Sequence, residues 1–160
     1  MKIIFLDIDG VLNYRDSDII DARCLDNLKF ILEKTEAKIV LISSWKHFLD
    51  DNILDNLKRS NNQKQLEEFL KYRDILGKIF VNELSILDVA PDLGEHRSDE
   101  IALWLTQNLD LGVESFVIID DFNCEYDKNY PDKWIRPSWF SIGLTNEMAE
   151  KAIMILNSDI

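Results

Sequence analysis

The sequence predicts an α/β fold built on a mainly parallel sheet in a single domain, and two observations carry this prediction. Short apolar runs of strand length alternate along the chain with longer segments in which apolar residues recur at helical spacing. Strands that alternate with helices are joined by right-handed crossovers, which set the strands parallel to one another in one sheet. The chain has 160 residues, a length that fits one domain. We therefore expect residues 1–160 to form a single domain.

Five strands are expected. The two clearest, Ile39–Ile42 and Phe116–Ile119, are apolar at every position, which is typical of a strand covered on both faces. The weakest pattern is that of the third strand. The expected strands are Lys2–Leu6, Ile39–Ile42, Lys78–Val81, Phe116–Ile119 and Trp139–Ile142.

The helices between these strands are expected from apolar residues three or four positions apart. The first spans Ala22–Lys34, and two more follow the second strand, around Leu49–Leu57 and Leu66–Leu70. Another opens near Asp99, where acidic side chains favour the positive end of a helix. The closing helix begins after Thr145, its expected N-cap.

Polar residues follow three of the expected strands. Asp7-Ile8-Asp9-Gly10 follows the first strand, Ser43-Ser44 the second, and Asp120-Asp121 the fourth. In a parallel sheet the carboxyl ends of the strands meet at one edge, where ligands bind. We therefore expect these three groups of side chains to converge at one rim.

The acidic residues of this rim predict a metal site. Asp7 and Asp9 are two residues apart at a strand end, so alternation places both carboxylates on one face. Gly10 then allows the backbone to turn sharply. Together with Asp120 and Asp121, these carboxylates repel one another, which raises at least one pKa or recruits a hard cation. Oxygen ligands without His or Cys suit Mg²⁺.

These motifs resemble those of the haloacid dehalogenase (HAD) superfamily and occur in the same order. The segment Phe5–Leu12 is similar to the first motif, a strand followed by DxDG, and Leu41–Ser43 is similar to the second, a strand ending in Ser or Thr. Val117–Asp121 resembles the fourth motif, a strand ending in two aspartates. The third motif is a single Lys or Arg near a helix start, and Arg97 matches it best.

A finer similarity is to the HAD domains of Swiss Army knife RNA repair proteins. They share a string like Ser43-Ser44-Trp45-Lys46 and a helix start like Gly143-Leu144-Thr145. The resemblance implies a Rossmann-like three-layer sandwich with a five-stranded sheet in the order 3-2-1-4-5. Only residues 13–42 separate the first two motifs, which leaves no room there for a large cap domain. We expect a capless or minimally capped protein with an open site.

The resemblance also implies an activity, that of a Mg²⁺-dependent HAD-type phosphohydrolase acting on phosphate monoesters through an aspartyl-phosphate. Asp7 would be the nucleophile, and Asp9 would act first as general acid and then as general base. Asp7, the backbone carbonyl of Asp9 and an acid of the fourth motif would hold Mg²⁺. Asp121 is the favoured direct ligand, with Asp120 in support.

Phosphate binding would fall to Ser43 and Arg97. Ser44 is an alternative to Ser43, because a Ser after a strand is commonly just the N-cap of a helix. Lys46 and Lys78 are weaker matches than Arg97, since Lys46 lies too close to the second motif and Lys78 would precede a strand.

The charge of the chain limits its partners. A net charge of −12 argues against binding duplex nucleic acid through many phosphate contacts. The segment Lys128–Arg136 runs against this trend and interleaves bases with Tyr130 and Trp134, a mixture that can stack on bases or ribose. More often such a segment is a surface loop with its rings tucked in. An open site suits bulky substrates such as a phosphoprotein or a nucleic-acid end.

We expect a cytoplasmic protein without membrane association. No apolar run reaches the roughly 20 residues of a membrane helix, and Met1–Asp7 is too short an apolar start for a signal peptide. Cys24 and Cys124 cannot form a disulfide framework, which fits a reducing compartment.

Three alternatives compete with a phosphatase as the function of this chain. A phosphotransferase, or a catalytically weak phosphate-binding module, would keep the same fold and site. A response-regulator receiver is disfavoured, because the expected third strand runs into Asn82 and offers no phosphate-accepting Asp. A purely structural or partner-binding protein would leave the three polar strand ends unexplained.

Overall fold

The computed structural model describes residues 1–14, 17–80, 84–94, 96–138 and 143–158. The chain divides into two compact units, which are described separately. The larger unit comprises Met1–Ile42 and Ile86–Ile160, and the smaller unit comprises Ser43–Ser85.

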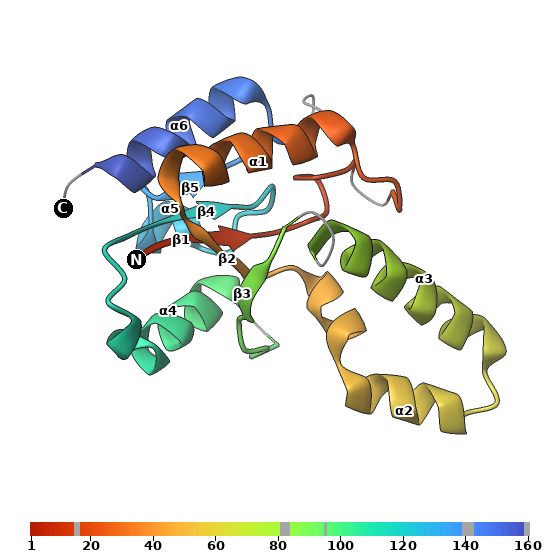
Figure 1. The fold of residues 1–160 in the computed structure, drawn as a ribbon. Helices are drawn as coiled ribbons and strands as arrows, with labels where there is room; N and C mark the ends of the chain where they lie inside the picture. Colours follow the sequence, from red (N-terminus) through yellow and green to blue (C-terminus); the bar gives the residue numbers. More distant parts are fainter. Residues whose placement is uncertain (15–16, 81–83, 95, 139–142, 159–160) are drawn as a thin grey trace. The chain divides into compact units, whose positions relative to one another are not determined.

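The larger unit contains a five-stranded sheet whose strands are all parallel, in the order β3-β2-β1-β4-β5 (Figure 1). This confirms the predicted α/β, Rossmann-like fold and its strand order, and the small chain carries no large cap domain. The strands are β1 (Lys2–Leu6), β2 (Lys38–Leu41), β3 (Ile86–Val89), β4 (Ser115–Ile119) and β5 (Trp134–Ile135).

β1 is the central strand, and its register aligns the carboxyl ends of β1, β2 and β4 at one edge of the sheet. Leu6, its last residue, pairs with Leu41 of β2 on one side and with Ile119 of β4 on the other. The pairing continues past the strand, because the backbone N–H of Asp7 donates to the carbonyl of Ile119 at 3.0 Å. The residues that follow β1 and β4 are therefore neighbours.

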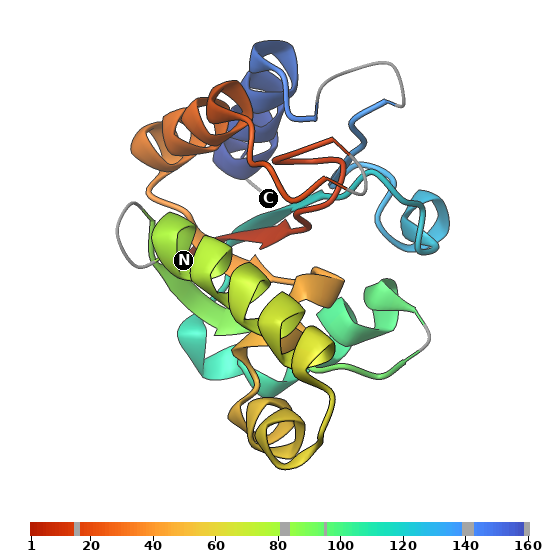
Figure 2. The ribbon, with the colours of Figure 1, turned by 90° about the vertical axis from the view of Figure 1, so that its right-hand side faces the viewer.

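Helices cover both faces of the sheet. The helices α1 (Ala22–Thr35) and α6 (Asn146–Asn157) lie side by side on one face, and α4 (Arg97–Gln107) lies on the other (Figures 1 and 2). The Thr145 hydroxyl accepts a hydrogen bond from the N–H of Met148 at 3.3 Å, which confirms the predicted N-cap of α6. Within the described residues, no helix has the length and hydrophobicity needed to cross a bilayer.

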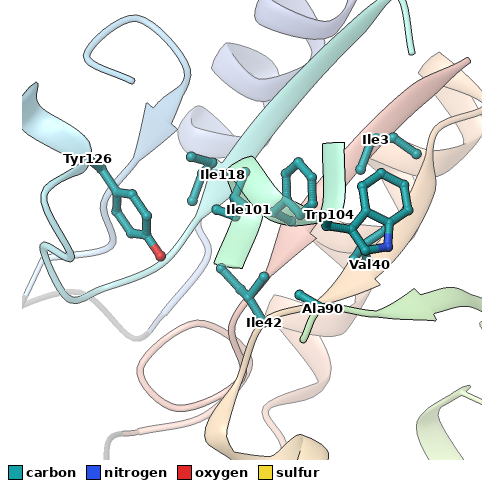
Figure 3. Packing of buried hydrophobic residues seen from close by; sticks show 9 residues of the cluster. Ile3, Val40, Ile42, Ala90, Ile101, Trp104, Ile118 and Tyr126 are labelled. Carbon is teal, nitrogen blue, oxygen red and sulfur yellow. The ribbon is translucent and has the colours of Figure 1, made fainter. Parts of the chain in front are cut away.

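The core between the sheet and α4 is built from alternate residues of the strands. Ile3, Val40 and Ile118 pack with Ile101 and Trp104 of α4 (Figure 3). The Trp104 indole N–H donates to the Asp88 carboxylate at 2.7 Å, so its polar atom is satisfied. Each fully buried aliphatic or aromatic side chain contributes about 1.5–3 kcal/mol to folding, so this layer holds α4 firmly on the sheet.

Two short helices complete the larger unit. The 3₁₀ helix η2 (Leu109–Leu111) leads from α4 toward β4, and α5 (Tyr126–Asn129) follows β4. Tyr126 is completely buried and belongs to the same core as Trp104 (Figure 3). Its hydroxyl donates a hydrogen bond to the Asp120 carboxylate.

The smaller unit is helical, with η1 (Ser44–Leu49), α2 (Asp51–Arg59) and α3 (Gln63–Phe80). Aromatic rings hold these helices together. Phe48 stacks on Tyr72 with ring centroids 4.7 Å apart, and Trp45 meets Tyr72 edge-on at 4.9 Å. Arg73 of α3 forms an ion pair with Asp51 of α2 at 2.6 Å.

The prediction of a strand at Lys78–Val81 is wrong. Helix α3 continues through Phe80, and the third strand is β3 (Ile86–Val89). Leu76, Ile79 and Phe80 are buried at helical spacing, and within a short window such an apolar helix end has the same pattern as a strand. β3 itself is only partly buried, so its sequence carried a weak signal.

The expected fifth strand, Trp139–Ile142, lies outside the described residues. The fifth strand of the described sheet is the two-residue strand β5 (Trp134–Ile135). The expected elements at α1, β2 and β4 are confirmed to within a few residues at their ends. The helix expected around Leu66–Leu70 is confirmed as α3, which extends ten residues further, to Phe80.

Candidate active site

The backbone brings Asp7 and Asp120 together at the carboxyl edge of the sheet. Asp7 follows β1 and Asp120 follows β4, and the register pairs the residues just before them, Leu6 and Ile119. The N–H of Asp120 donates to the carbonyl of Ile135 at 3.2 Å, so the sheet also holds this residue. Both side chains are buried. The first and fourth strands therefore lie side by side, as the sequence predicts.

Three carboxylates form a cluster at this edge. One oxygen each from Asp7, Asp120 and Asp121 lies within 4.8 Å of the other two. Asp7 Oδ1 is buried and has no hydrogen-bond partner among the described residues. A buried carboxylate oxygen without a donor is costly, and an all-oxygen ligand set is the type that Mg²⁺ prefers. The residues present therefore fit a hard divalent cation.

Gly10 makes room for the third carboxylate. Its φ is +73°, and a Cβ atom on it would lie 2.2 Å from Asp121 Oδ2. No other amino acid fits that space without displacing Asp121. The glycine of the DxDG motif thus serves both the turn and the access of Asp121 to the cluster.

Arg97, the first residue of α4, is the basic group beside the acids. Its Nη1 donates to Asp120 Oδ2 at 2.8 Å and lies 3.2 Å from Asp7 Oδ2. Burial lowers the pKa of Arg97, but the carboxylates of Asp7 and Asp120 more than offset this, so its pKa is raised and it stays charged. The alternatives Lys46 and Lys78 lie in η1 and α3 of the smaller unit.

The electrostatics of Asp7 are dominated by burial. Burial and the charge of Asp120 raise its pKa, whereas Arg97 and the backbone N–H of Ile8 lower it, with a net rise to about 8. A single guanidinium thus does not outweigh the loss of water and the neighbouring acid. A divalent cation in the cluster would favour the ionised form of Asp7.

Asn13 orients the second aspartate of the motif and was missed by sequence reasoning. This fully buried residue donates from Nδ2 to Asp9 Oδ1 at 3.1 Å and to the carbonyl of Ser17 at 2.5 Å. Its Oδ1 accepts from the N–H of Gly10 at 3.0 Å. The only signal in the sequence was a polar residue directly after the apolar pair that follows Gly10. The Asp9 carboxylate itself is not part of the three-acid cluster.

Two aromatic residues support Asp120 and were also missed as parts of the site. The hydroxyl of Tyr126 donates to Asp120 Oδ2 at 3.0 Å, and the indole N–H of Trp134 donates to the backbone carbonyl of Asp120 at 2.9 Å. Burial and the charge of Asp120 raise the pKa of Tyr126, so it remains a hydrogen-bond donor. Asp120 Oδ1 accepts from the N–H of Phe122 at 2.9 Å. Asp120 is thus held by several donors and is shaped to support the cluster.

Ser43 and Ser44 open the smaller unit. Ser43 is buried, and its hydroxyl accepts from the N–H of Trp45 at 3.2 Å, so it acts as the N-cap of η1. Ser44 is exposed. The capping role was the alternative that the sequence left open for Ser43, and a role of either serine in phosphate binding stays a prediction.

A comparison with known protein families matches residues 3–149 to the HAD domain in Swiss Army Knife RNA repair proteins. No curated protein and no solved structure matches the chain. The matched region runs from β1 to the first turn of α6 and contains all five strands, the three clustered acids and Arg97. The chain therefore belongs to the family of HAD domains found in Swiss Army Knife RNA repair proteins.

Proposed function

We propose that this protein is a Mg²⁺-dependent phosphatase that hydrolyses phosphate monoesters through an aspartyl-phosphate on Asp7. The observation that carries the proposal is the buried Asp7 Oδ1, which has no hydrogen-bond partner among the described residues. Two further carboxylates and the guanidinium of Arg97 surround the same side chain. Membership in the HAD superfamily supports a phosphohydrolase.

The residues that would hold the metal are Asp7, Asp121 and the backbone carbonyl of Asp9. Asp120 would support them, since both of its carboxylate oxygens already accept hydrogen bonds from the protein. When bound, Mg²⁺ offsets the repulsion between carboxylate and phosphate and stabilises the charge on the transferring group.

In the first step, an Asp7 carboxylate oxygen attacks phosphorus. The new oxygen–phosphorus bond forms as the ester bond breaks, and protonated Asp9 gives its proton to the leaving oxygen. The Asn13 amide, 3.1 Å from Asp9 Oδ1, orients the Asp9 carboxyl for this transfer. Arg97, beside Asp7 Oδ2, offsets negative charge as the phosphate approaches.

In the second step, the roles of the two aspartates change. Asp9, now a carboxylate, accepts a proton from water as the water oxygen attacks phosphorus. The bond between Asp7 and phosphorus breaks, which releases inorganic phosphate and restores both side chains. Ser43 or Ser44 would hydrogen-bond a phosphate oxygen, and Arg97 would pair with the same group during both steps.

For the substrate, we propose a phosphorylated nucleic-acid end. The matched family is that of RNA repair proteins, and the lack of a large cap leaves the site open to a large substrate. A phosphoprotein is the other macromolecular substrate that an open site accommodates. We further propose that both compact units belong to one HAD-like domain, since the family match spans them. We also propose that the protein is cytoplasmic, which fits two cysteines, Cys24 and Cys124, that form no disulfide among the described residues.

The test is release of phosphate from an aryl phosphate by the purified protein. We expect release with Mg²⁺, loss of release with a chelator and recovery when Mg²⁺ is added back. Asp7→Asn and Asp9→Asn should each lower kcat by about 10²-fold or more, because each removes a group that acts in the chemical step. Asp110→Asn makes the same chemical change on exposed η2 and serves as the matched control.

Release that survives the chelator or Asp7→Asn would contradict the proposed function. Binding of phosphate without turnover would favour the alternative, a catalytically weak phosphate-binding module. Transfer of phosphate to an added alcohol rather than to water would favour a phosphotransferase.

A further inference from the structure

We propose that Arg136 binds the phosphate next to the one that is hydrolysed, so that the site selects a phosphorylated oligonucleotide end over a small phosphate monoester. This inference rests on the proposed function and assigns a residue that determines its substrate. It starts from the basic and aromatic segment Lys128–Arg136, which none of the catalytic roles above uses.

Arg136 is fixed beside the acidic cluster. Its Nε donates to the backbone carbonyl of Asp121 at 3.1 Å, and its guanidinium lies over the ring of Trp134, 5.4 Å from the centroid. Trp134 in turn donates to the carbonyl of Asp120. Trp134 and Arg136 therefore donate hydrogen bonds to the consecutive backbone carbonyls of Asp120 and Asp121. These hydrogen bonds hold the Arg136 guanidinium at the rim of the site.

The charge of Arg136 is available for a ligand. Arg97 lies against Asp7 and Asp120, so its charge is largely offset within the protein. Arg136 is exposed, bonds a neutral carbonyl through Nε and forms no ion pair with any described residue. A guanidinium has five N–H donors and matches a phosphate with two parallel bonds. The terminal nitrogens of Arg136 are suited to such a contact.

Arg136 also connects the acidic cluster to a groove. The end of β5 and α6 line a groove of about 450 Å³, a size within the range of ligand pockets, about 300–1,000 Å³. Both apolar methionines and charged groups of both signs line it. Its walls include Arg136, Glu147, Met148, Glu150, Lys151 and Met154. A substrate that extends beyond its terminal phosphate would pass Arg136 on entering this groove.

An exposed aromatic ring next to the acids favours an oligonucleotide over a phosphopeptide. Phe122 follows Asp121 directly, its N–H donates to Asp120, and its side chain is 57% exposed. Large exposed aromatic side chains at such a site offer a stacking surface for a nucleobase. A single-stranded oligonucleotide end supplies the base, the terminal phosphate and the neighbouring phosphate together.

The test compares kcat/KM for RNA oligonucleotides phosphorylated at the 5′ or 3′ end with kcat/KM for an aryl phosphate. We expect Arg136→Gln to lower kcat/KM for one of the oligonucleotides by roughly ten- to a hundredfold, through KM, and to lower that for the aryl phosphate less. Arg136→Lys keeps the charge but loses the fork and should fall between. Lys128→Gln removes the same charge from the same segment and should keep the wild-type ratio of the two substrates.

Two results would overturn the inference. If Arg136→Gln lowers kcat/KM equally for oligonucleotide and aryl phosphate, Arg136 only positions the acid pair. If Arg136→Gln lowers kcat/KM for a phosphopeptide as much as it does for the oligonucleotide, the second group that Arg136 binds is not a nucleic-acid phosphate.

A binding experiment separates this inference from the proposed function. With Asp7→Asn as the background, the Kd of a fluorescent phosphorylated RNA should rise roughly tenfold on adding Arg136→Gln. The slope of log Kd against log salt should fall by about 0.7, the value for one lost phosphate contact on a single strand. This holds even if the wild-type protein proves unable to hydrolyse the RNA. No binding, or an unchanged slope, would refute the role of Arg136.

Discussion

At the scale of single residues, the charge state of the acids in the site is governed by their burial and by their close approach to one another. Asp7 is buried beside Asp120, and only one of its oxygens is near a basic partner, Arg97. Such an arrangement destabilises the ionised carboxylate unless a cation is present. Burial of these acids therefore costs folding stability, as is common at functional sites.

The raised pKa of Asp7 predicts a pH-dependent stability in the metal-free protein. Between the ordinary value of 3.8 and about 8, the folded state holds a proton on Asp7 that the unfolded chain has released. The contribution of this group is therefore fully present below pH 3.8 and is lost as the pH rises through about 8. Its slope is at most about 1.4 kcal/mol per pH unit, because one proton is involved.

Urea unfolding in the presence of a chelator, at several pH values from 5 to 9, measures this effect. Asp7→Asn removes the titrating group, so the free energy of unfolding should fall less steeply with pH than in the wild type. Equal slopes for the two proteins would show that Asp7 does not hold a proton in the folded state.

Gly10 predicts a second effect at the residue scale. In Gly10→Ala the new Cβ would lie 2.2 Å from Asp121 Oδ2, so Asp121 must move out of the cluster. We expect Mg²⁺ affinity to fall about tenfold or more, in addition to about 1 kcal/mol of backbone strain. Gly94→Ala is the matched control, since Gly94 has a φ of +75° and no atom within 4 Å of the added Cβ.

Calorimetric titration of Mg²⁺ separates the two substitutions. Both substitutions should carry a similar cost of backbone strain, but only Gly10→Ala adds the clash with Asp121 and should weaken metal binding. A Gly10→Ala protein that binds Mg²⁺ as the wild type does would mean that Asp121 is not a ligand.

At the scale of elements, the site residues are held by helix starts and strand ends rather than by long loops. α4 presents Arg97 in its first turn, while Trp104, two turns later, anchors the helix on the sheet and meets Phe5 edge-on at 5.5 Å. The start of α6 is tied to the loop after β1, because the N–H of Leu144 donates to the carbonyl of Val11 at 2.8 Å. Packing of these elements therefore supports the geometry of the acids.

The cap of α6 predicts an effect on stability. Thr145→Ala removes the hydrogen bond to the N–H of Met148 and should cost about 1 kcal/mol in the free energy of unfolding. Thr106→Ala removes a hydroxyl from the exposed side of α4, where it bonds the carbonyl of Ala102, and should cost less because Ala is the better helix former. Urea unfolding of the two variants tests this, and a larger loss for Thr106→Ala would be evidence against the capping role.

At the scale of the whole molecule, the excess of acidic residues predicts that cations stabilise the folded protein. The net charge is −12, and three of the acids lie within one cluster. A cation that binds only the folded protein stabilises it in proportion to the logarithm of its concentration above Kd.

Mg²⁺ should therefore raise Tm more than NaCl at the same ionic strength. At a hundred times Kd the gain is about 2.7 kcal/mol. Asp121→Asn should lose most of this specific gain, and Asp110→Asn, on exposed η2, should keep it. Thermal unfolding with each salt is the measurement, and equal shifts for the two salts would speak against a specific site.

Short sequence patterns predicted most of the fold and the acidic residues at the centre of the site. β1, β4 and the acids that follow them were predictable, because an apolar run and a motif directly after it are both read within about ten residues. The same locality misled at the end of α3, where buried Leu76, Ile79 and Phe80 have the pattern of a strand. β5, with two residues, is too short to leave a pattern of its own.

The contacts that hold the acids in place could not be predicted from the sequence, because they join residues that are distant along the chain. Asp120 accepts three of its hydrogen bonds from Arg97, Tyr126 and Trp134, which lie between 6 and 23 residues away along the chain. Arg136 reaches Asp121 across 15 residues. Apolar patterning and motif order specify which strands form and which acids end them, because those are properties of neighbouring residues. The tertiary structure alone decides which side chains form hydrogen bonds and ion pairs with the acidic cluster, because the sheet brings distant segments of the chain together. A hydrogen bond depends on position in space and not on spacing in the chain.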